Sequence, residues 1–107
     1  MPRTVLVSGD AARDIESIHS YIAAHTSAVA ADKILAALED RIMQLATLAD
    51  RGNFPKELAA TGSKEFRELH FKPYRIVYRV EGNNVVVYCI ADGRRDMSLL
   101  LRRRLLE

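Results

Sequence analysis

The sequence predicts an α+β fold in which an antiparallel sheet is covered on one face by two helices. Two observations support this prediction. The first half of the chain has apolar residues at helical spacing in two successive segments, and the second half has three runs rich in Val, Ile, Tyr and Phe, separated by turn residues. The expected order is β-α-α-β-β-β followed by a short C-terminal helix. A length of 107 residues suits one domain, spanning residues 1–107.

The first elements are a strand and a helix. A short apolar strand is expected at residues 4–7, and Ser8-Gly9-Asp10 then supplies an N-cap oxygen for a helix that begins near Asp10 and ends near His25. The apolar stripe of this helix recurs every three or four positions and consists of Ala11, Ile15, Ile18 and Ile22. Such a stripe needs a sheet to cover.

A second, longer helix follows, with Thr26 or Ser27 as its N-cap and Gly52 as its end in a left-handed conformation. Its apolar stripe is Ala31, Ile34, Leu35, Leu38, Ile42, Leu45 and Leu48. The connection between the two helices is so short that they must form an antiparallel hairpin. Residues 53–64 are expected to be irregular.

The three strands at residues 66–92 should form a meander. Gly82-Asn83 is the expected two-residue hairpin loop and Lys72-Pro73 the other turn. The predicted pairs are Val80 with Val85, Tyr78 with Val87, Ile76 with Cys89, and Leu69 with Ile76.

Because side chains alternate along a strand, this register assigns each residue to a face. The face expected to pack on the helices holds Leu69, Tyr74, Ile76, Tyr78, Val80, Val85, Val87, Cys89 and Ala91. The other face is expected to stay open and holds Phe66, Glu68, His70, Arg75, Val77, Arg79, Val86, Tyr88 and Ile90. An open face with cationic, aromatic and aliphatic side chains is either a functional surface or the binding site of a partner.

The C-terminal segment is basic. Asp96 can cap a short helix whose apolar edge leads into Arg102-Arg103-Arg104, and we expect a partner to cover this tail. Residues 1–63 hold 6 Lys and Arg against 8 Asp and Glu, a net charge of −2, while residues 64–107 hold 10 against 6, a net charge of +4. The asymmetry favours a polyanionic or acidic partner for the second half, and a solvated surface is the alternative.

Composition excludes several classes of protein. No apolar run approaches the roughly 18 residues of a membrane span, and Cys89 has no partner for a disulfide, so we expect a cytoplasmic protein that does not bind a membrane. Cys89 should pack in the core. No cofactor is expected and no metal site, because neither His19 nor His25 has a ligand at metal-binding spacing.

The strand sequences resemble the RelE/ParE superfamily of toxins from type II toxin-antitoxin systems. The resemblance is carried by Arg67-Glu68-Leu69, then Tyr74-Arg75-Ile76-Val77-Tyr78-Arg79-Val80, then Ile90-Ala91-Asp92-Gly93-Arg94-Arg95-Asp96. These pieces occur in the right order on a matching layout, and together with the helical hairpin they span nearly the whole chain. The resemblance implies a RelE/ParE-like fold.

RelE-like members of this superfamily are ribosome-dependent endoribonucleases that cleave mRNA, whereas ParE-like members poison DNA gyrase. On the resemblance, Arg75 and Arg95 stand at the two phosphate-binding arginines of the RelE branch. That branch's paired lysines and its tail tyrosine fall on Phe66, Glu68 and Leu101. If the chain is a ribonuclease, its catalytic residues are Glu68, His70, Arg75 and Arg95. For Glu68 and His70 the alternative is a cross-strand charge cluster.

The Gly93-Arg94-Arg95-Asp96 turn followed by a leucine-rich basic tail resembles the ParE branch more closely. The resemblance therefore implies a ParE-like toxin that inhibits growth by poisoning DNA gyrase, with the ribosome and mRNA as the alternative target. It also implies a cognate antitoxin whose acidic and apolar C-terminal segment folds onto this surface, in a dimer or a hetero-oligomer. The residues expected to bind the target or the antitoxin are Arg67, Arg75, Arg79, Arg94, Arg95, Arg102, Arg103 and Arg104.

Overall fold

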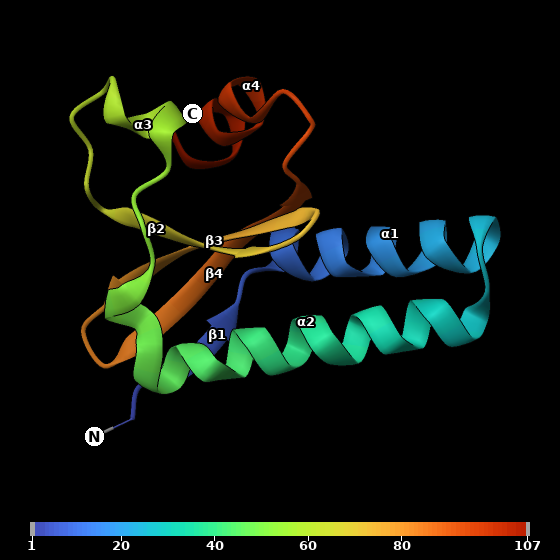
Figure 1. The fold of residues 1–107 in the computed structure, drawn as a ribbon. Helices are drawn as coiled ribbons and strands as arrows, with labels where there is room; N and C mark the ends of the chain where they lie inside the picture. Colours follow the sequence, from blue (N-terminus) through green and yellow to red (C-terminus); the bar gives the residue numbers. More distant parts are fainter. Residues whose placement is uncertain (1, 107) are drawn as a thin grey trace.

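The computed structural model describes residues 2–106 and has the predicted α+β architecture (Figure 1). Its elements are β1 (Thr4–Val7), α1 (Gly9–His25), α2 (Ala28–Leu48), the 3₁₀ turn η1 (Ala49–Arg51), α3 (Lys56–Ala59), β2 (Phe66–Phe71), β3 (Tyr74–Glu81), β4 (Asn84–Asp92), α4 (Met97–Leu101) and the π-helical turn η2 (Arg102–Leu106). The segment predicted to be irregular contains the short helix α3.

The sheet is mixed, with strand order β1-β4-β3-β2. Strands β2, β3 and β4 form the expected antiparallel meander, but β1 pairs with β4 in parallel. The prediction of a wholly antiparallel sheet is therefore wrong in one strand. The direction of β1 could not be derived from a hairpin, because α1, α2, η1, α3 and two strands separate it from β4.

The helical hairpin packs on one face of the sheet, as predicted (Figure 1). Ser8 Oγ accepts a hydrogen bond from the Ala11 amide at 3.1 Å and Ser27 Oγ from the Ala30 amide at 3.0 Å, so each helix has a serine N-cap. The buried core between hairpin and sheet contains Ala11, Leu38, Ile42, Leu45, Ala49, Ile76, Tyr78, Val85, Val87 and Ile90.

A β-bulge in β4 changes the predicted assignment of residues to faces. Tyr78 pairs with Val87 as expected, but the next residue, Val77, pairs with Cys89, so the register shifts between Val77 and Tyr78. One extra residue inverts the alternation beyond it. Ile90, not Cys89, is therefore opposite Ile76 and faces the hairpin. Cys89 and Ala91 lie on the other face, in contrast to the prediction.

The remaining predicted pairs, Val80 with Val85 and Leu69 with Ile76, are confirmed. The loop at Gly82 is confirmed as well. Gly82 has φ +64°, a left-handed conformation that glycine adopts without strain.

The second face of the sheet is covered, so the expectation that it stays open is wrong. Figure 1 shows α3, α4 and the C-terminal turn on the side of the sheet opposite the hairpin. Their apolar residues form a second buried cluster of Leu58, Phe66, Val77, Cys89, Ala91, Met97 and Leu101. Asp96 caps α4 through the Leu99 amide at 3.0 Å, as predicted. The tail is held by the protein itself.

Gly52 does not have the predicted left-handed conformation. Its φ is −66° and ψ 147°, because η1 extends the helical path and the chain leaves it in an extended conformation. A Cβ at this position would lie 2.1 Å from the Tyr78 hydroxyl. That hydroxyl donates to the Ala49 carbonyl at 2.6 Å and accepts from the Gly52 amide at 3.1 Å. Gly52 is thus required for close approach to a core tyrosine.

Candidate functional site

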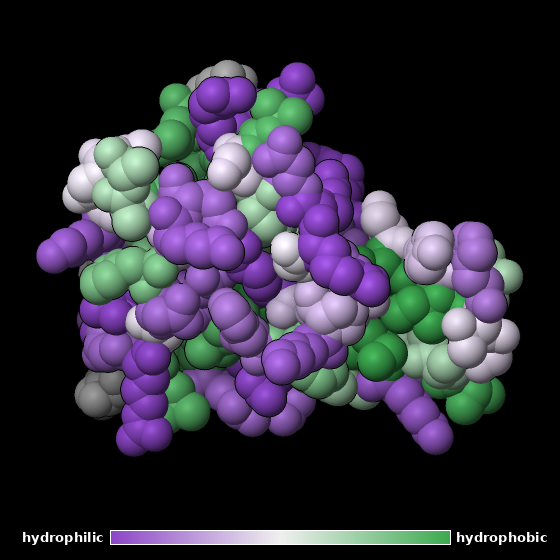
Figure 2. All heavy atoms as spheres, turned by 45° about the horizontal axis from the view of Figure 1, so that its top comes forward, coloured by the Kyte–Doolittle hydropathy of each residue, from purple (hydrophilic) through white to green (hydrophobic). Residues whose placement is uncertain are grey.

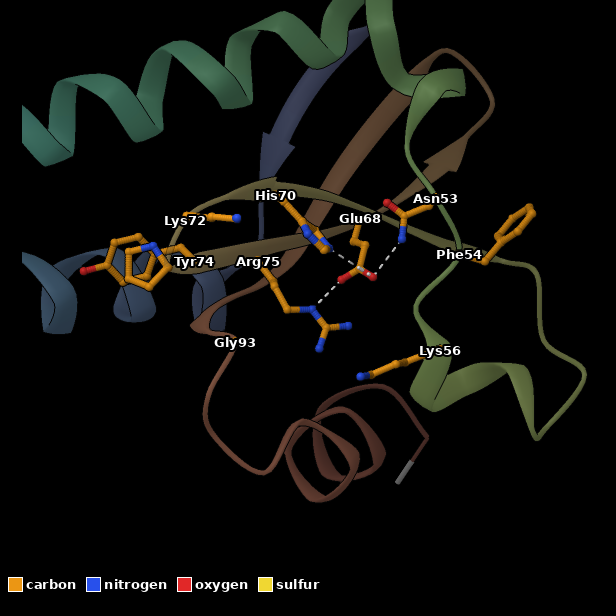
Figure 3. Close-up of a pocket in the computed structure, with 10 residues that line it drawn as sticks. Asn53, Phe54, Lys56, Glu68, His70, Lys72, Tyr74, Arg75 and Gly93 are labelled. Carbon is orange, nitrogen blue, oxygen red and sulfur yellow. Dashed lines mark hydrogen bonds and ion pairs between the residues drawn. The ribbon is translucent and has the colours of Figure 1, made fainter.

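Arg75, the central candidate residue on β3, lies inside an ion-pair network on the second face. Its side chain is 10% exposed. Its Nε donates to Glu68 Oε1 at 2.6 Å, while Nη1 and Nη2 donate to the two carboxylate oxygens of Glu57 at 2.8 and 2.7 Å. Figure 3 shows the pair with Glu68. All three nitrogens of the guanidinium thus already donate to carboxylates.

The charges in this network stabilise one another. The hydrogen bond from Arg75 holds the pKa of Glu57 below its ordinary value, and the hydrogen bond to Glu57 raises the pKa of Arg75. A bidentate pair of guanidinium and carboxylate has the geometry with which an arginine binds phosphate. Glu57, which the sequence analysis did not single out, therefore occupies the side of Arg75 that an anionic ligand would need.

Glu68 and His70 lie beside Arg75 on β2, where they were expected. The Glu68 side chain is 3% exposed, and its Oε2 accepts from Asn53 Nδ2 at 3.0 Å and lies 3.5 Å from His70 Nε2. The His70 side chain is 54% exposed. Glu68 is therefore enclosed by Arg75, Asn53 and His70, as in the cross-strand charge cluster considered from the sequence.

A hollow of about 370 Å³ opens beside this network (Figure 3). Lys56 and Lys72 line it, and among residues 2–106 neither lysine makes an ion pair. Gly93 closes one side, and a Cβ there would lie 2.9 Å from Arg75 Cδ. The loop after β4 can pass this close to Arg75 only with a glycine at that position.

Arg95 lies in a different place from Arg75. It follows β4 and lines a second hollow of about 460 Å³ between α1 and the sheet, which Arg75 does not line. The four residues predicted as a ribonuclease site are thus divided. Glu68, His70 and Arg75 share one hollow, and Arg95 belongs to the other.

The remaining predicted arginines differ in how firmly they are held. Arg94 pairs with Asp92, from Nε to Oδ1 at 3.0 Å and from Nη2 to Oδ2 at 2.6 Å, and this pair lowers the pKa of Asp92 to about 2. The Arg94 side chain is nevertheless 82% exposed. Arg102 and Arg103 on η2 are also exposed.

Arg67 and Arg79 each lie over an aromatic ring. Arg67 donates to the Gly52 carbonyl at 2.8 Å and lies 4.5 Å from the centre of the Phe54 ring. Arg79 lies 5.9 Å from the centre of the Phe66 ring. Both arginines therefore contribute to packing as well as to charge.

Arg104 binds within the protein. Its Nη1 and Nη2 donate to the two oxygens of Asp14 at 2.9 and 3.1 Å, and Nη1 also donates to the Tyr88 carbonyl at 2.9 Å. Asp14 Oδ2 accepts in addition from the Ile90 amide at 2.9 Å. This contact joins α1, β4 and the tail, and no pattern in the sequence predicted it.

Residues 2–106 were also compared with the requirements of a metal site, a membrane-spanning helix and a reactive cysteine. No three His, Cys, Asp or Glu residues gather closely enough there to hold a metal ion. None of the helices described has the length and apolar character to cross a membrane. Burial raises the pKa of the Cys89 thiol to about 11, so this cysteine stays protonated at neutral pH.

Comparisons with known proteins agree with the architecture. Residues 5–97 match the family model described as the ParE toxin of the type II toxin-antitoxin system parDE. The fold is similar to a chain of the chromosomal ParDE toxin-antitoxin system from P. aeruginosa, with a TM-score of 0.71 at 17% identity over 84% of this chain and 95% of the other. It is also similar to a chain of the toxin-antitoxin complex RelBE2 from Mycobacterium tuberculosis, with a TM-score of 0.63 at 22% identity over 86% and 99%. The comparison with curated proteins gave no match.

Proposed function

The chain belongs to the ParE toxin family of type II toxin-antitoxin systems, and from this premise we propose that it inhibits growth by acting on DNA gyrase and is neutralised by a co-encoded antitoxin. A target of this kind would place the protein in the cytoplasm. The proposed activity is inhibition by binding, which requires no cofactor and no hydrolytic chemistry.

The observation that favours gyrase over mRNA is the state of Arg75. Cleavage of RNA by its 2′-hydroxyl requires a base, an acid and cations that meet at the phosphate. In this protein Glu57 and Glu68 already bind every nitrogen of Arg75. Phe66 and Leu101, at two of the positions where the RelE branch has proton-transfer or cationic groups, are buried apolar residues. Each missing proton-transfer group would lower the cleavage rate by about 10²- to 10⁴-fold.

The exposed arginines are the proposed contact with the target or the antitoxin. Arg94, Arg95, Arg102 and Arg103 are exposed, whereas Arg75 and Arg104 serve internal ion pairs. On the side of the molecule drawn in Figure 2, hydrophilic side chains cover much of the middle, while apolar side chains gather toward the tip of the helical hairpin. Exposed cations of this kind suit an acidic partner.

An apolar hollow of about 410 Å³ between α1 and α2 supports the proposal of a protein partner. Ile15, Leu35, Ile42 and Met43 line it, and Met43 is 61% exposed. It lies beside β1, which is one of the two edge strands of the sheet. An edge strand next to an apolar groove can receive an added strand or an amphipathic helix, and we propose that the antitoxin uses it.

The test uses purified protein with gyrase in supercoiling and DNA-cleavage assays, and with programmed ribosomes carrying mRNA. We expect supercoiling to stop, or cleaved DNA to accumulate, while the mRNA remains intact. Reversing the charge of Arg102 and Arg103 to Glu should weaken the inhibition, and the matched control is Arg51→Glu, which reverses an exposed arginine on η1.

The opposite result would support the ribonuclease. Cuts in ribosome-bound mRNA that disappear in Glu68→Gln or His70→Ala, with the fold retained, would contradict the gyrase proposal. Expression of the chain alone should arrest growth, and expression with the antitoxin should restore it. Normal growth at a good yield of folded protein would contradict the toxin activity itself.

A further inference from the structure

The hollow that Arg95 lines lies beside the ion-pair network, and of its lining residues only Arg94 and Arg95 enter the proposed function. Its apolar lining includes Ile18 and Ile22 of α1 and Ile90 of β4, which we call its floor, and Tyr21 of α1 and Tyr74 of β3 line it as well. We call it the tyrosine hollow. At about 460 Å³ it falls in the size range of small-ligand sites, which combine an apolar lining with a few polar groups.

The tyrosine hollow carries one uncompensated positive charge. Two carboxylates line it, but Asp14 is paired with Arg104 and Asp92 with Arg94. Arg95 is exposed, and its guanidinium makes no hydrogen bond or ion pair within residues 2–106. One cation at the rim of an apolar hollow therefore remains available for one anionic group.

The two tyrosines provide the other polar groups. Tyr21 is 64% exposed, and its ring stacks on His25 with the ring centres 4.1 Å apart. Neither phenol hydroxyl has a hydrogen-bond partner among the described residues. Burial and the charge of Asp92 raise the pKa of Tyr74, so its hydroxyl remains a donor.

We propose that the tyrosine hollow binds a nucleotide, with the base on the isoleucine floor beside the two tyrosine rings and the phosphate on Arg95. An aliphatic peptide side chain would fill the floor but would leave two tyrosine hydroxyls unsatisfied when it covered them, and such groups are costly to bury. A base carries donors and acceptors on its edge and also stacks on aromatic rings. The nucleotide can be free or can be an unpaired residue at a 5′-phosphorylated strand end.

The inference goes beyond the proposed function and does not depend on it, since binding is measured on the purified protein without gyrase. The probes are thymidine 5′-monophosphate, thymidine, inorganic phosphate and a 5′-phosphorylated single strand of thymidines. Binding is followed by NMR on backbone amides and on the arginine Nε signals. We expect the monophosphate to shift Tyr21, Tyr74 and Arg95, and thymidine or phosphate alone to bind about tenfold more weakly.

Substitutions separate a built site from general attraction to cations. Arg95→Gln and Tyr21→Leu should each weaken monophosphate binding about tenfold, because one removes the cation and the other a stacking ring. Arg51→Gln removes an exposed arginine on η1, outside the hollow, and should leave the affinity unchanged. Circular dichroism is used to check that all three variants fold. Tighter binding of the phosphorylated strand than of the monophosphate would identify a strand end as the ligand, and equal binding would identify the free nucleotide.

Three outcomes would overturn the proposal. The first is the absence of shifts at millimolar monophosphate. The second is an equal loss of affinity in Arg51→Gln and Arg95→Gln, which would show general electrostatic attraction. The third is equal or tighter binding of an N-acetylated Phe-Asp amide, an aromatic ring with a carboxylate, which would show that the hollow accepts a protein segment instead.

Discussion

The two faces of the sheet are both buried, but different interactions hold their covering layers. The hairpin face is covered by two long helices through apolar residues such as Leu38 and Leu45. The second face is covered by helices of only four and five residues and by a π-helical turn. Helices this short are unstable alone. Besides the apolar cluster that contains Leu58 and Met97, two ion pairs hold this layer, because Arg75 on β3 binds Glu57 of α3 and Arg104 on η2 binds Asp14 of α1.

On the second face, a charged side chain on a strand attaches a covering helix to the sheet. The family resemblance places Arg75 at a phosphate-binding position, yet here Glu57 of α3 binds it and thereby attaches the covering layer. Breaking the ion pairs should therefore loosen the layer of short helices over the second face. Truncating buried apolar residues should instead loosen the packing of the helical hairpin on the other face.

The largest loss of stability is expected from Arg75→Gln. The substitution leaves Glu57 and Glu68 close together without their cation, and breaking a buried ion pair in this way costs about 3 to 5 kcal/mol. Urea unfolding at pH 7 measures the cost. It should shrink at acidic pH, where the carboxylates can be protonated, whereas a cost independent of pH would argue against charge as the cause.

Ile76→Ala should cost about 2 to 5 kcal/mol, because Ile76 is fully buried against the hairpin. The milder Ile76→Val should cost about 0.5 to 1.5 kcal/mol. Unlike the Arg75 substitution, neither loss should change much with pH. Urea unfolding at pH 7 and pH 4.5 compares the two faces directly.

Asp14→Asn should cost about 1.5 to 3 kcal/mol, the range for hydrogen bonds to charged groups, because it weakens the bonds to Arg104 and the Ile90 amide. The tail should become more mobile while the hairpin stays ordered. Hydrogen exchange measures this as faster exchange in residues 97–106 than in residues 28–48. Equal acceleration in both segments would contradict a separate attachment of the second face.

The smallest effect is the pH dependence contributed by Glu57. Its pKa is lowered in the folded protein from an ordinary value of 4.5, so its contribution to stability is fully present above that pH and is lost as the pH falls through the folded pKa. Glu57→Gln should flatten this part of the pH profile of unfolding. Urea midpoints at a series of pH values below 5 measure the difference from the original chain.

The sequence predicted the parts of the fold that depend on local patterns. Ser27, Asp96 and Gly82 mark a helix start, a cap and a hairpin loop by their own chemistry, and each was found in that role. The bulge after Val87 was not predictable, because both registers place aliphatic or aromatic residues on each face.

The candidate site was predicted less well, since it depends on contacts between distant residues. Arg75 and Glu68 were recognised as neighbours from the strand register. Their partner Glu57 was missed because it lies in a segment with no periodic pattern, where nothing indicated that a short helix would reach the sheet. Arg104 was assigned to a surface for the same reason, because its partner Asp14 is 90 positions away in the sequence.

The distance in sequence between Asp14 and Arg104 also affects how the protein is synthesised. The chain is made from its N-terminus, so α1 and α2 can form early, while Arg104 is among the last residues to leave the ribosome. The carboxylate of Asp14 must wait for almost the whole chain before it has its partner. The layer over the second face is therefore expected to be completed only after translation has ended, and a chain truncated before residue 104 should leave Asp14 without its partner and the tail loosely attached.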